Sequence, residues 1–544
     1  KAGLAPVRAS GDGQRLIVSG NRVDGAPGLV LAGSRPQVTE IPAGERKGVT
    51  RSAAHSFLRE AVRVPGKVFD AKRDFGAKGD GVADDTAALQ RALDSAPGRN
   101  GKRVVMPDGV YRSGTLRVGS DTHLELRPGA LLQGSSDIAD YPLMGGVLMG
   151  DQHGRHLLDV REAVNVRIDG GGIIDGAGPS FWHPSTHPLA WRRAHPQRPS
   201  PMIACTGCSD LVIENLTLRN SAGWTLHLHG CDRVRVCSVK ITNPLFGPNT
   251  DGIDIDGSHE VVVTDCRIET GDDAVVIKTS ADARDCRDIL VANCLLRSHC
   301  AALKLGAGES FHDMRRIEFR DCVVQNTHRP LALYSLEGAT IEDITVRNIV
   351  ADTACAIALT RPIHIELRRR RSQSRAGSIR NVRITNFTCM TEGRILLAAE
   401  AGLVIENVSL EGIRLIYPTV DDPQLMDPDA GGGQFANHNP EARRARAAVV
   451  AENVRDLSVT DLSLTWPEPG ADPGTIRDVP WLPVEKAVNG TDGIFGREGF
   501  NTGTLPPFAL LWGCGLEGGR FDAEGLHPLA GAARFDLDGC TIRV

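Results

Sequence analysis

Residues 249–280, NTDGIDIDGSHEVVVTDCRIETGDDAVVIKTS, hold one copy of a structural repeat. Two acidic clusters flank it, with Asp251, Asp254 and Asp256 before it and Asp272 and Asp273 after it. The repeat, VVVTDCRI at 261–268, follows the pattern apolar-x-apolar-x-(Asn/Asp)-apolar-x-apolar. The same pattern returns as ILVANCLL at 289–296 and as IEFRDCVV at 317–324. A pattern that recurs at this interval is typical of stacked coils, in which each coil adds short strands to parallel sheets.

The spacing of the central polar residue supports this interpretation. Asp265, Asn293 and Asp321 follow one another at equal intervals, and Asn348 comes after almost the same interval. Asn and Asp tolerate left-handed backbone angles and can bond to their equivalents on the next coil. Looser copies of the repeat begin at residues 211, 234, 344, 382, 403 and 457.

Cysteines recur with the same spacing as the polar residue. Cys266, Cys294 and Cys322 each follow directly after it, which indicates a buried ladder of small apolar side chains. Cys205 and Cys208 form a CxxC that no second CxxC accompanies, so a zinc site is not expected there. We expect neither a metal nor a cofactor.

The pattern predicts an all-β fold, a right-handed parallel β-helix (solenoid) with an N-terminal capping helix. A leucine-rich repeat horseshoe is the alternative, but its LxxLxLxxN pattern is absent. Asp84 or Asp85 can cap a helix that would cover an otherwise unpaired sheet edge. The apolar face of that helix would consist of residues 88, 89, 92 and 93.

Three segments are expected along the chain. Residues 1–66 would form an N-terminal arm or a small β appendage. Residues 67–465 would form the β-helix, and residues 466–544 a β segment that caps or extends it. An insertion at 179–201 carries Trp182 and Trp191, which either stack on a sugar ring or hold the loop to the body; both interpretations remain open.

The composition is that of a globular protein. The 544 residues are 41% hydrophobic and carry a net charge of −5, which gives no indication of nucleic acid or of an anionic membrane surface. No apolar run reaches the roughly 18 residues needed to span a bilayer. The chain begins at Lys1, and we expect a secreted or periplasmic protein whose signal peptide has been removed. A solenoid closed at both ends is expected to be a monomer.

The two acidic clusters suggest chemistry. Asp251 and Asp272 are separated by close to one repeat, so their carboxyl groups can lie side by side on neighbouring coils. Paired carboxylates of this kind serve acid/base cleavage of a glycosidic bond. The alternative is that these residues only cap turns. If the strand is regular, alternation places Asp254 and Asp256 on the face opposite Asp251, so they are expected to be turn or ladder residues rather than catalysts.

Several motifs in the chain resemble those of glycoside hydrolase family 28, the polygalacturonase family of the pectin-lyase-like β-helix superfamily. FGAKGDGVADDTAALQRAL at 75–93 resembles the superfamily's N-terminal signature, which indicates fold more than reaction. NSAGWTLHLHGC at 220–231 resembles a family stretch, and NTD at 249–251 and GDD at 271–273 are similar to the catalytic motifs. SHCAALKLG at 298–306 lies where the family has Gly-His-Gly.

The resemblance implies an inverting glycosidase. Asp272 would be the general acid, and Asp251 and Asp273 would hold and deprotonate a water. His299 would tune the acid or bind a substrate hydroxyl, and Asn249 would orient Asp251 or a sugar hydroxyl.

Two lysines can contact the substrate as well. Lys278 and Lys304 would meet a carboxylate of the sugar, or would form exterior salt bridges. The expected partner is therefore a polysaccharide or an oligosaccharide.

One segment departs from the family pattern. Endo-polygalacturonases of the family carry Arg-x-Lys where this chain has Ala332 and Tyr334, and Arg329 lies three residues out of place. Neither Ala nor Tyr can form a charge-assisted bond to a carboxylate. A pectin-type substrate with a neutral, rhamnose-like sugar is therefore expected, with a polysaccharide lyase or epimerase, or a non-catalytic glycan-binding β-helix, as the alternatives.

Overall fold

The computed structural model describes residues 66–98, 100–144, 154–184, 192–353, 361–418, 442, 445–467 and 508–544. All of them belong to the compact unit Ala53–Val544. The predicted arm at 1–66 lies outside the described residues except for Gly66, and so do Trp191 and residues 468–507.

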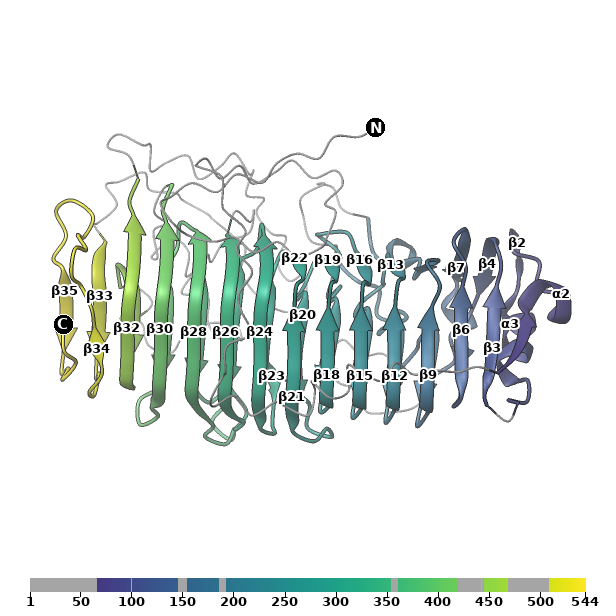
Figure 1. The fold of residues 1–544 in the computed structure, drawn as a ribbon, viewed down its shortest axis with the longest axis horizontal. Coiled ribbons are helices and arrows are strands. Elements are labelled where there is room, and N and C mark those ends of the chain that lie inside the picture. Colours follow the sequence, from purple (N-terminus) through teal and green to yellow (C-terminus); the bar gives the residue numbers. More distant parts are fainter. Residues whose placement is uncertain are drawn as a thin grey trace, which may run out of the picture. The chain divides into compact units, whose positions relative to one another are not determined.

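The described residues fold as a right-handed parallel β-helix, as predicted. Their strands lie side by side in chain order in two sheets (Figure 1). Thirteen strands form one sheet: β5 (Leu116–Arg117), β8 (Leu158–Arg161), β11 (Ile203–Thr206), β14 (Leu226–His229), β17 (Ile253–Asp256), β20 (Val275–Thr279), β23 (Ala301–Ser310), β25 (Arg329–Ser335), β27 (Ile363–Leu367), β29 (Ile395–Ala399), β31 (Ala447–Glu452), β33 (Ala509–Cys514) and β35 (Phe535–Asp538).

The other sheet collects the remaining strands of the coils. It comprises β1 (Lys67–Asp70), β2 (Asp80–Asp84), β3 (Lys102–Met106), β4 (Gly109–Ser113), β6 (Thr122–Leu126), β7 (Ala130–Gly134), β9 (Val164–Asp169), β10 (Ile173–Asp175), β12 (Ser209–Glu214), β13 (Thr217–Arg219), β15 (Asp232–Cys237), β16 (Lys240–Thr242), β18 (His259–Thr264), β19 (Arg267–Thr270), β21 (Cys286–Ala292), β22 (Leu295–Ser298), β24 (Met314–Gln325), β26 (Thr340–Asp352), β28 (Ser378–Met390), β30 (Ile405–Ile416), β32 (Val454–Thr465) and β34 (Arg520–Phe521).

The strand registers reproduce the spacing of the repeat. Val261 pairs with Ile289, Ile289 with Ile317, and Ile317 with Ile344, and these steps equal the intervals between the polar residues of the same coils. Each coil therefore stacks in register on the one before it. Apolar side chains of both sheets meet inside the coils and form one continuous core.

The polar residue of the repeat turns each coil. Asp265, Asn293, Asp321 and Asn348 all have φ between 54° and 58°, in the left-handed region. Asn293 Nδ2 donates to Asp265 Oδ1, and Asn348 Nδ2 donates to Asp321 Oδ1 at 2.8 Å. The prediction of a bend with bonds along the ladder is confirmed. Cys266, Cys294 and Cys322, beside these bends, are buried as predicted.

The predicted helix is present as α3 (Thr86–Asp94). Its buried residues are the predicted apolar face, 88, 89, 92 and 93. Asp84 Oδ1 accepts from Thr86 N at 2.9 Å, whereas Asp85 Oδ1 and Oδ2 accept from the backbone of Lys78 and Gly79. A shorter helix, α2 (Ala71–Phe75), precedes it, and both lie beside the first described strands (Figure 1). Short 3₁₀ turns occur at Ile138–Asp140 and Gly178–Phe181.

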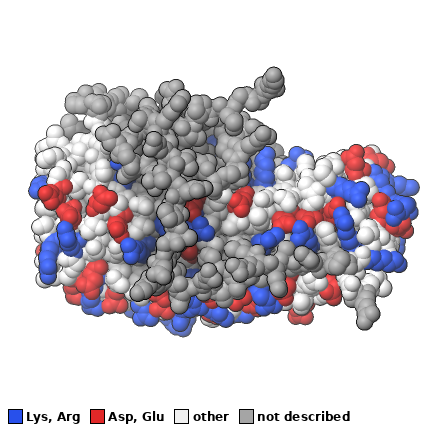
Figure 2. Space-filling view, viewed as in Figure 1, with Lys and Arg blue, Asp and Glu red and all other residues white. Residues whose placement is uncertain are grey.

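Charged side chains of both signs are interspersed over the face shown in Figure 2. Charged side chains of neighbouring coils also form ion pairs, as Glu342 does with Arg315 and Arg380. The longest helix of the described ranges, α3, has nine residues, too few to cross a membrane. The three predicted segments, 1–66, 67–465 and 466–544, stay predictions.

Candidate active site

Asp251, Asp272 and Asp273 lie just before the first residues of two neighbouring strands of the 13-stranded sheet. Asp251 precedes β17, and Asp272 and Asp273 precede β20, which pairs in register with β17. The backbone ladder continues past the strand ends, since Gly252 N donates to Asp273 O at 2.8 Å. Side chains that the sequence separates by close to one repeat are thereby brought to neighbouring coils.

The Lys278 ammonium group forms ion pairs with two carboxylates of the first acidic cluster. Its Nζ lies 2.7 Å from Asp254 Oδ1 and 3.5 Å from Asp251 Oδ2, and it also lies 3.4 Å from the centre of the Trp224 ring. Asp251 and Asp254 thus share one ammonium group, and the separation expected of a regular strand does not occur. The strand begins only at Ile253, so Asp251 lies in the turn before it, where alternation does not apply.

Burial is the largest influence on the pKa values of Asp251 and Asp254. It raises the pKa of Asp251 well above its usual value, and the negative charges of Asp272 and Asp254 raise it further. Burial also raises the pKa of Asp254, to about 7, against the opposing charge of Lys278. Asp251 Oδ1 accepts no hydrogen bond from any residue in the described ranges.

Asp273 has the opposite electrostatic environment. Burial would raise its pKa, but the Lys304 ammonium, with Nζ 2.5 Å from Asp273 Oδ2, outweighs burial and lowers the pKa. Asp273 Oδ1 also accepts from Ala301 N at 3.1 Å. The Asp273 side chain is therefore a fixed, ionised carboxylate at neutral pH.

Asp272 is partly exposed and lies next to two residues of the following coil. Its carboxylate, that of Asp273 and the Cys300 thiol all have an oxygen or sulfur atom within 4.8 Å of one another. Ser298 Oγ donates to Asp272 O at 2.7 Å and so ties the two coils together.

His299 lies on that same coil. Its ring is packed edge-on against Phe246, 4.6 Å between centroids. Burial, with the nearby charge of Arg297, lowers the pKa of His299 to about 4, so the ring is neutral at neutral pH. Its Nδ1 has no hydrogen-bond partner among the described residues.

Asn249 is fixed by an arginine of the insertion at 179–201. Arg198 Nη2 donates to Asn249 Oδ1 at 3.0 Å, and Arg198 Nη1 donates to Ala222 O and Pro248 O. Arg198 is almost fully buried. No sequence signal indicated this contact, because the two residues are far apart in the chain and Arg198 belongs to no repeat.

Arg329 and Tyr334 are both buried and bond to each other. Arg329 donates from Nη1 to Tyr334 Oη at 3.0 Å and from Nη2 to Cys300 Sγ at 3.1 Å. Tyr334 Oη also lies 2.9 Å from His364 Nδ1. Ala332, on the same strand, is fully buried as well. These contacts make Arg329 and Tyr334 parts of an internal network.

Trp182 has the second of its two predicted roles. Its side chain is 8% exposed, and its Nε1 donates to Ala222 O at 2.9 Å. A ring that stacks on a sugar needs an open face, which this burial denies. Trp182 is therefore an anchor of the loop, and the prediction that it binds substrate is not supported.

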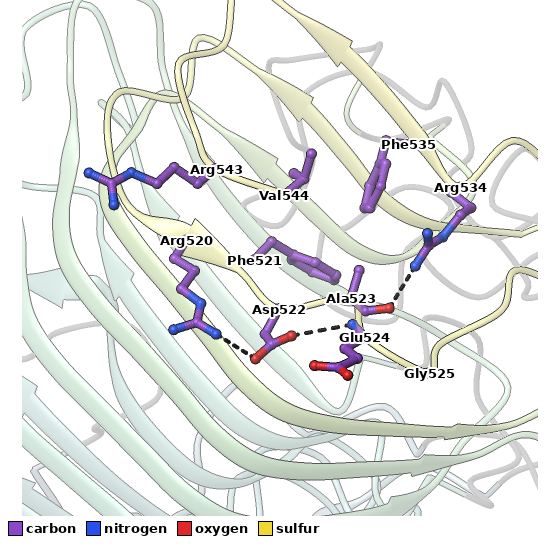
Figure 3. A pocket seen from close by; sticks show the side chains of 10 residues that line it. All are labelled: Arg520, Phe521, Asp522, Ala523, Glu524, Gly525, Arg534, Phe535, Arg543 and Val544. Carbon is purple, nitrogen blue, oxygen red and sulfur yellow. Dashed lines mark hydrogen bonds and ion pairs between the residues drawn. The ribbon is translucent and has the colours of Figure 1, made fainter.

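A cavity of about 580 Å³ lies at the C-terminal end of the sheets, around β34 and β35. Figure 3 shows Phe521 and Phe535 there beside Arg520, Arg534 and Arg543. Arg520 pairs with Asp522 at 2.7 Å (Figure 3). This cavity contains none of the predicted site residues.

Comparison with known proteins gives two family matches. The family model described as "Glycosyl hydrolases family 28" matches residues 144–425, and that described as "Rhamnogalacturonase A/epimerase, pectate lyase-like" matches residues 69–124. The first spans more than half of the chain and includes both acidic clusters.

Two curated relatives agree with the larger match. An exo-poly-alpha-D-galacturonosidase of Dickeya chrysanthemi is 27% identical over 48% of this chain and 49% of its own length. A probable polygalacturonase of Arabidopsis thaliana is 25% identical over 63% of this chain and 76% of its own length. The match thus spans about half the length of the first relative.

Solved structures share the fold. An exopolygalacturonase of Thermotoga maritima has a TM-score of 0.58 at 20% identity, with 76% of this chain and 95% of that chain covered. A family 28 exopolygalacturonase of Yersinia enterocolitica has a TM-score of 0.57 at 19% identity, with coverages of 73% and 75%.

Proposed function

The chain belongs to glycosyl hydrolase family 28, and we propose on that basis that it hydrolyses a glycosidic bond of a pectin-type polysaccharide or oligosaccharide with inversion at the anomeric carbon. Inversion requires one carboxylic acid that protonates the leaving oxygen and a carboxylate that activates water on the other face of the sugar.

One observation carries the proposal. Asp251 is buried, its Oδ1 accepts no hydrogen bond from the described residues, and Asp272 of the next coil contributes strongly to its raised pKa. A buried acceptor without a donor is costly in a purely structural role and is suited to receive a proton from water. Asp251 is therefore assigned as the base, with Asp273 holding the same water.

Asp272 is assigned as the general acid. It is the most exposed of the three carboxyl groups, so a leaving-group oxygen can reach it. The charge of Asp272 contributes more than any other charge to the raised pKa of Asp251. Protonation of Asp272 removes that charge and so favours the ionised form of Asp251, although burial remains the largest cause of the raised pKa.

The other predicted residues position these three. Lys304 keeps Asp273 ionised, and Lys278 favours the ionised form of Asp251. Asn249 fixes the turn before Asp251 through Arg198. His299, which is neutral at neutral pH, would tune the acid or bind a sugar hydroxyl.

The proposed substrate has a neutral, rhamnose-like sugar next to the scissile bond. Ala332 and Tyr334 stand where endo-polygalacturonases of the family have Arg-x-Lys. Ala332 has no polar side-chain group, and the Tyr334 hydroxyl already bonds to Arg329 and His364. Polygalacturonate is the second candidate, because the similar proteins are named for it.

The test is release of reducing ends from polygalacturonate, a rhamnogalacturonan I backbone and an aryl α-L-rhamnoside, with Asp272→Asn and the exposed-carboxylate control Asp536→Asn in parallel. Activity on the rhamnose-containing substrates alone, lost on the rhamnogalacturonan I backbone in Asp272→Asn and kept in Asp536→Asn, supports both assignments. Activity mainly on polygalacturonate contradicts the substrate assignment. The anomer first released, followed by NMR, tests inversion.

Two other functions remain as outcomes of this test. An unsaturated product that absorbs in the ultraviolet would identify a lyase. Glycan binding without turnover, unaffected by Asp251→Asn, would identify a binding β-helix. We further propose a monomer that acts outside the cytoplasm, as a secreted or periplasmic protein.

A further inference from the structure

Two histidines and an aspartate converge on the outer face of the 13-stranded sheet. His227 and His229 are two residues apart on β14, so both side chains point to the same face. His229 is paired in register with Asp256 on β17. The inward neighbours Leu226 and Leu228 belong to the core.

The distances among the donor atoms suit a small metal ion. Asp256 Oδ2 lies 3.1 Å from His229 Nδ1 and 3.4 Å from His227 Nε2, and one donor atom of each residue lies within 4.8 Å of the others. Zinc ligands at about 2.0–2.1 Å in a tetrahedron are separated by about 3.3 Å. We propose that His227, His229 and Asp256 form a zinc-binding site with a fourth position open to solvent.

The surroundings orient these three ligands. Ser280 N donates to Asp256 Oδ1 at 2.8 Å, which leaves Oδ2 directed at the two histidines. His229 would bind through Nδ1, while its Nε2 lies 3.8 Å from Asp282 Oδ2. A carboxylate near the second ring nitrogen is the usual companion of a metal-bound histidine.

The charge of the cluster also fits a cation. In such a site the Asp256 carboxylate would supply one negative charge, and each neutral imidazole ring would supply one lone pair. Lys278, paired in register with Asp256, has its ammonium on Asp254. The side chain of His229 is 20% exposed, which gives an ion a route to the cluster.

A hydrogen-bonded cluster without metal is the competing explanation, in which both rings donate to Asp256 Oδ2. Such a cluster binds no ion and gains no stability from zinc. The prediction that the chain needs no metal rested on the cysteines, whose spacing says nothing about His227 and His229. The site lies outside the proposed acid/base group, so the proposal does not depend on the glycosidase function.

The test uses the purified full chain, stripped with chelator and then titrated with ZnCl₂. We expect one zinc per chain by elemental analysis after dialysis, a rise in Tm with zinc, and a visible absorption band when Co²⁺ replaces Zn²⁺. His229→Gln should abolish stoichiometric binding. Asp282→Asn, at a partly exposed site, should weaken binding about 10–100-fold and keep the fold.

His259→Gln is the matched control. His259 also lies near two carboxylates, 3.4 Å from Asp232 and 3.2 Å from Asp285, but outside the cluster. Zinc binding should be unchanged in this variant. No stoichiometric zinc in the unaltered chain, or equal loss in His259→Gln and His229→Gln, would overturn the proposal.

Discussion

Lys304 Nζ lies 2.5 Å from Asp273 Oδ2, and this ion pair joins two neighbouring coils at the proposed catalytic site. Both side chains are buried, and they interact by charge through little water. Each therefore keeps the other ionised: Lys304 lowers the pKa of Asp273, and Asp273 helps to raise that of Lys304 against the effect of burial.

Lys304→Met should lower kcat/KM by about 100-fold or more, because Asp273 then loses the ammonium group that keeps it ionised. Breaking a buried pair leaves an uncompensated charge and should also lower stability, by about 3–5 kcal/mol. Kinetics at several pH values and guanidinium unfolding check both effects. Lys240→Met, at an exposed lysine, is the control, and an equal loss in that variant would contradict the prediction.

Asp272→Asn should lower kcat on the natural glycan by about 10²–10⁴-fold, the usual contribution of a general acid. A substrate with a good leaving group, such as a dinitrophenyl glycoside, needs no proton and should lose far less activity. Asp251→Asn should lose activity on both substrates, because the base is needed in each case. Equal losses in Asp272→Asn on the two substrates would argue against the acid assignment.

The acidic limb of the pH–rate profile should move in opposite directions in two variants. Lys278 lowers the pKa of Asp251 and Asp254 raises it. The base must be ionised, so activity falls as the pH drops through the pKa of Asp251. Lys278→Met should therefore shift this limb to higher pH, by about 1 unit or more, and Asp254→Asn should shift it to lower pH. Shifts in the same direction would contradict Asp251 as the base.

Asn293 should tolerate glycine better than alanine. Asn293→Ala loses the hydrogen bond to Asp265 and strains a left-handed backbone, with a total cost of about 2–3 kcal/mol. Asn293→Gly loses only the hydrogen bond, with a cost of about 1 kcal/mol. The guanidinium midpoints of the two variants measure the difference, and equal midpoints would show that the backbone angle costs little.

The coils were predictable because their signal is local and repeated. Each copy places a polar residue at the bend and apolar residues inward, and Asp265, Asn293 and Asp321 have the predicted backbone and ladder contacts. The helix Thr86–Asp94 was equally predictable, because its apolar residues recur with the period of an α-helix.

Contacts of the site residues were harder to predict. Asp251 and Asp272 could be placed on neighbouring coils, but the position of Asp254 depended on where the strand begins. The contact between Arg198 and Asn249 depends on how a long insertion folds back on the coils, and no repeating sequence pattern indicates it. His227 and His229 did leave a signal, because two histidines two residues apart on a strand must share a face.

Equivalent outward side chains on β14, β17 and β20 stack about 4.8 Å apart, because these strands pair in register. A replacement on one coil changes one contact with a bound ligand and leaves the backbone of its neighbours in place. Outward side chains that form no ion pair with a neighbouring coil can therefore be exchanged one at a time without a change of fold, whereas pairs such as Lys304 and Asp273 must change together.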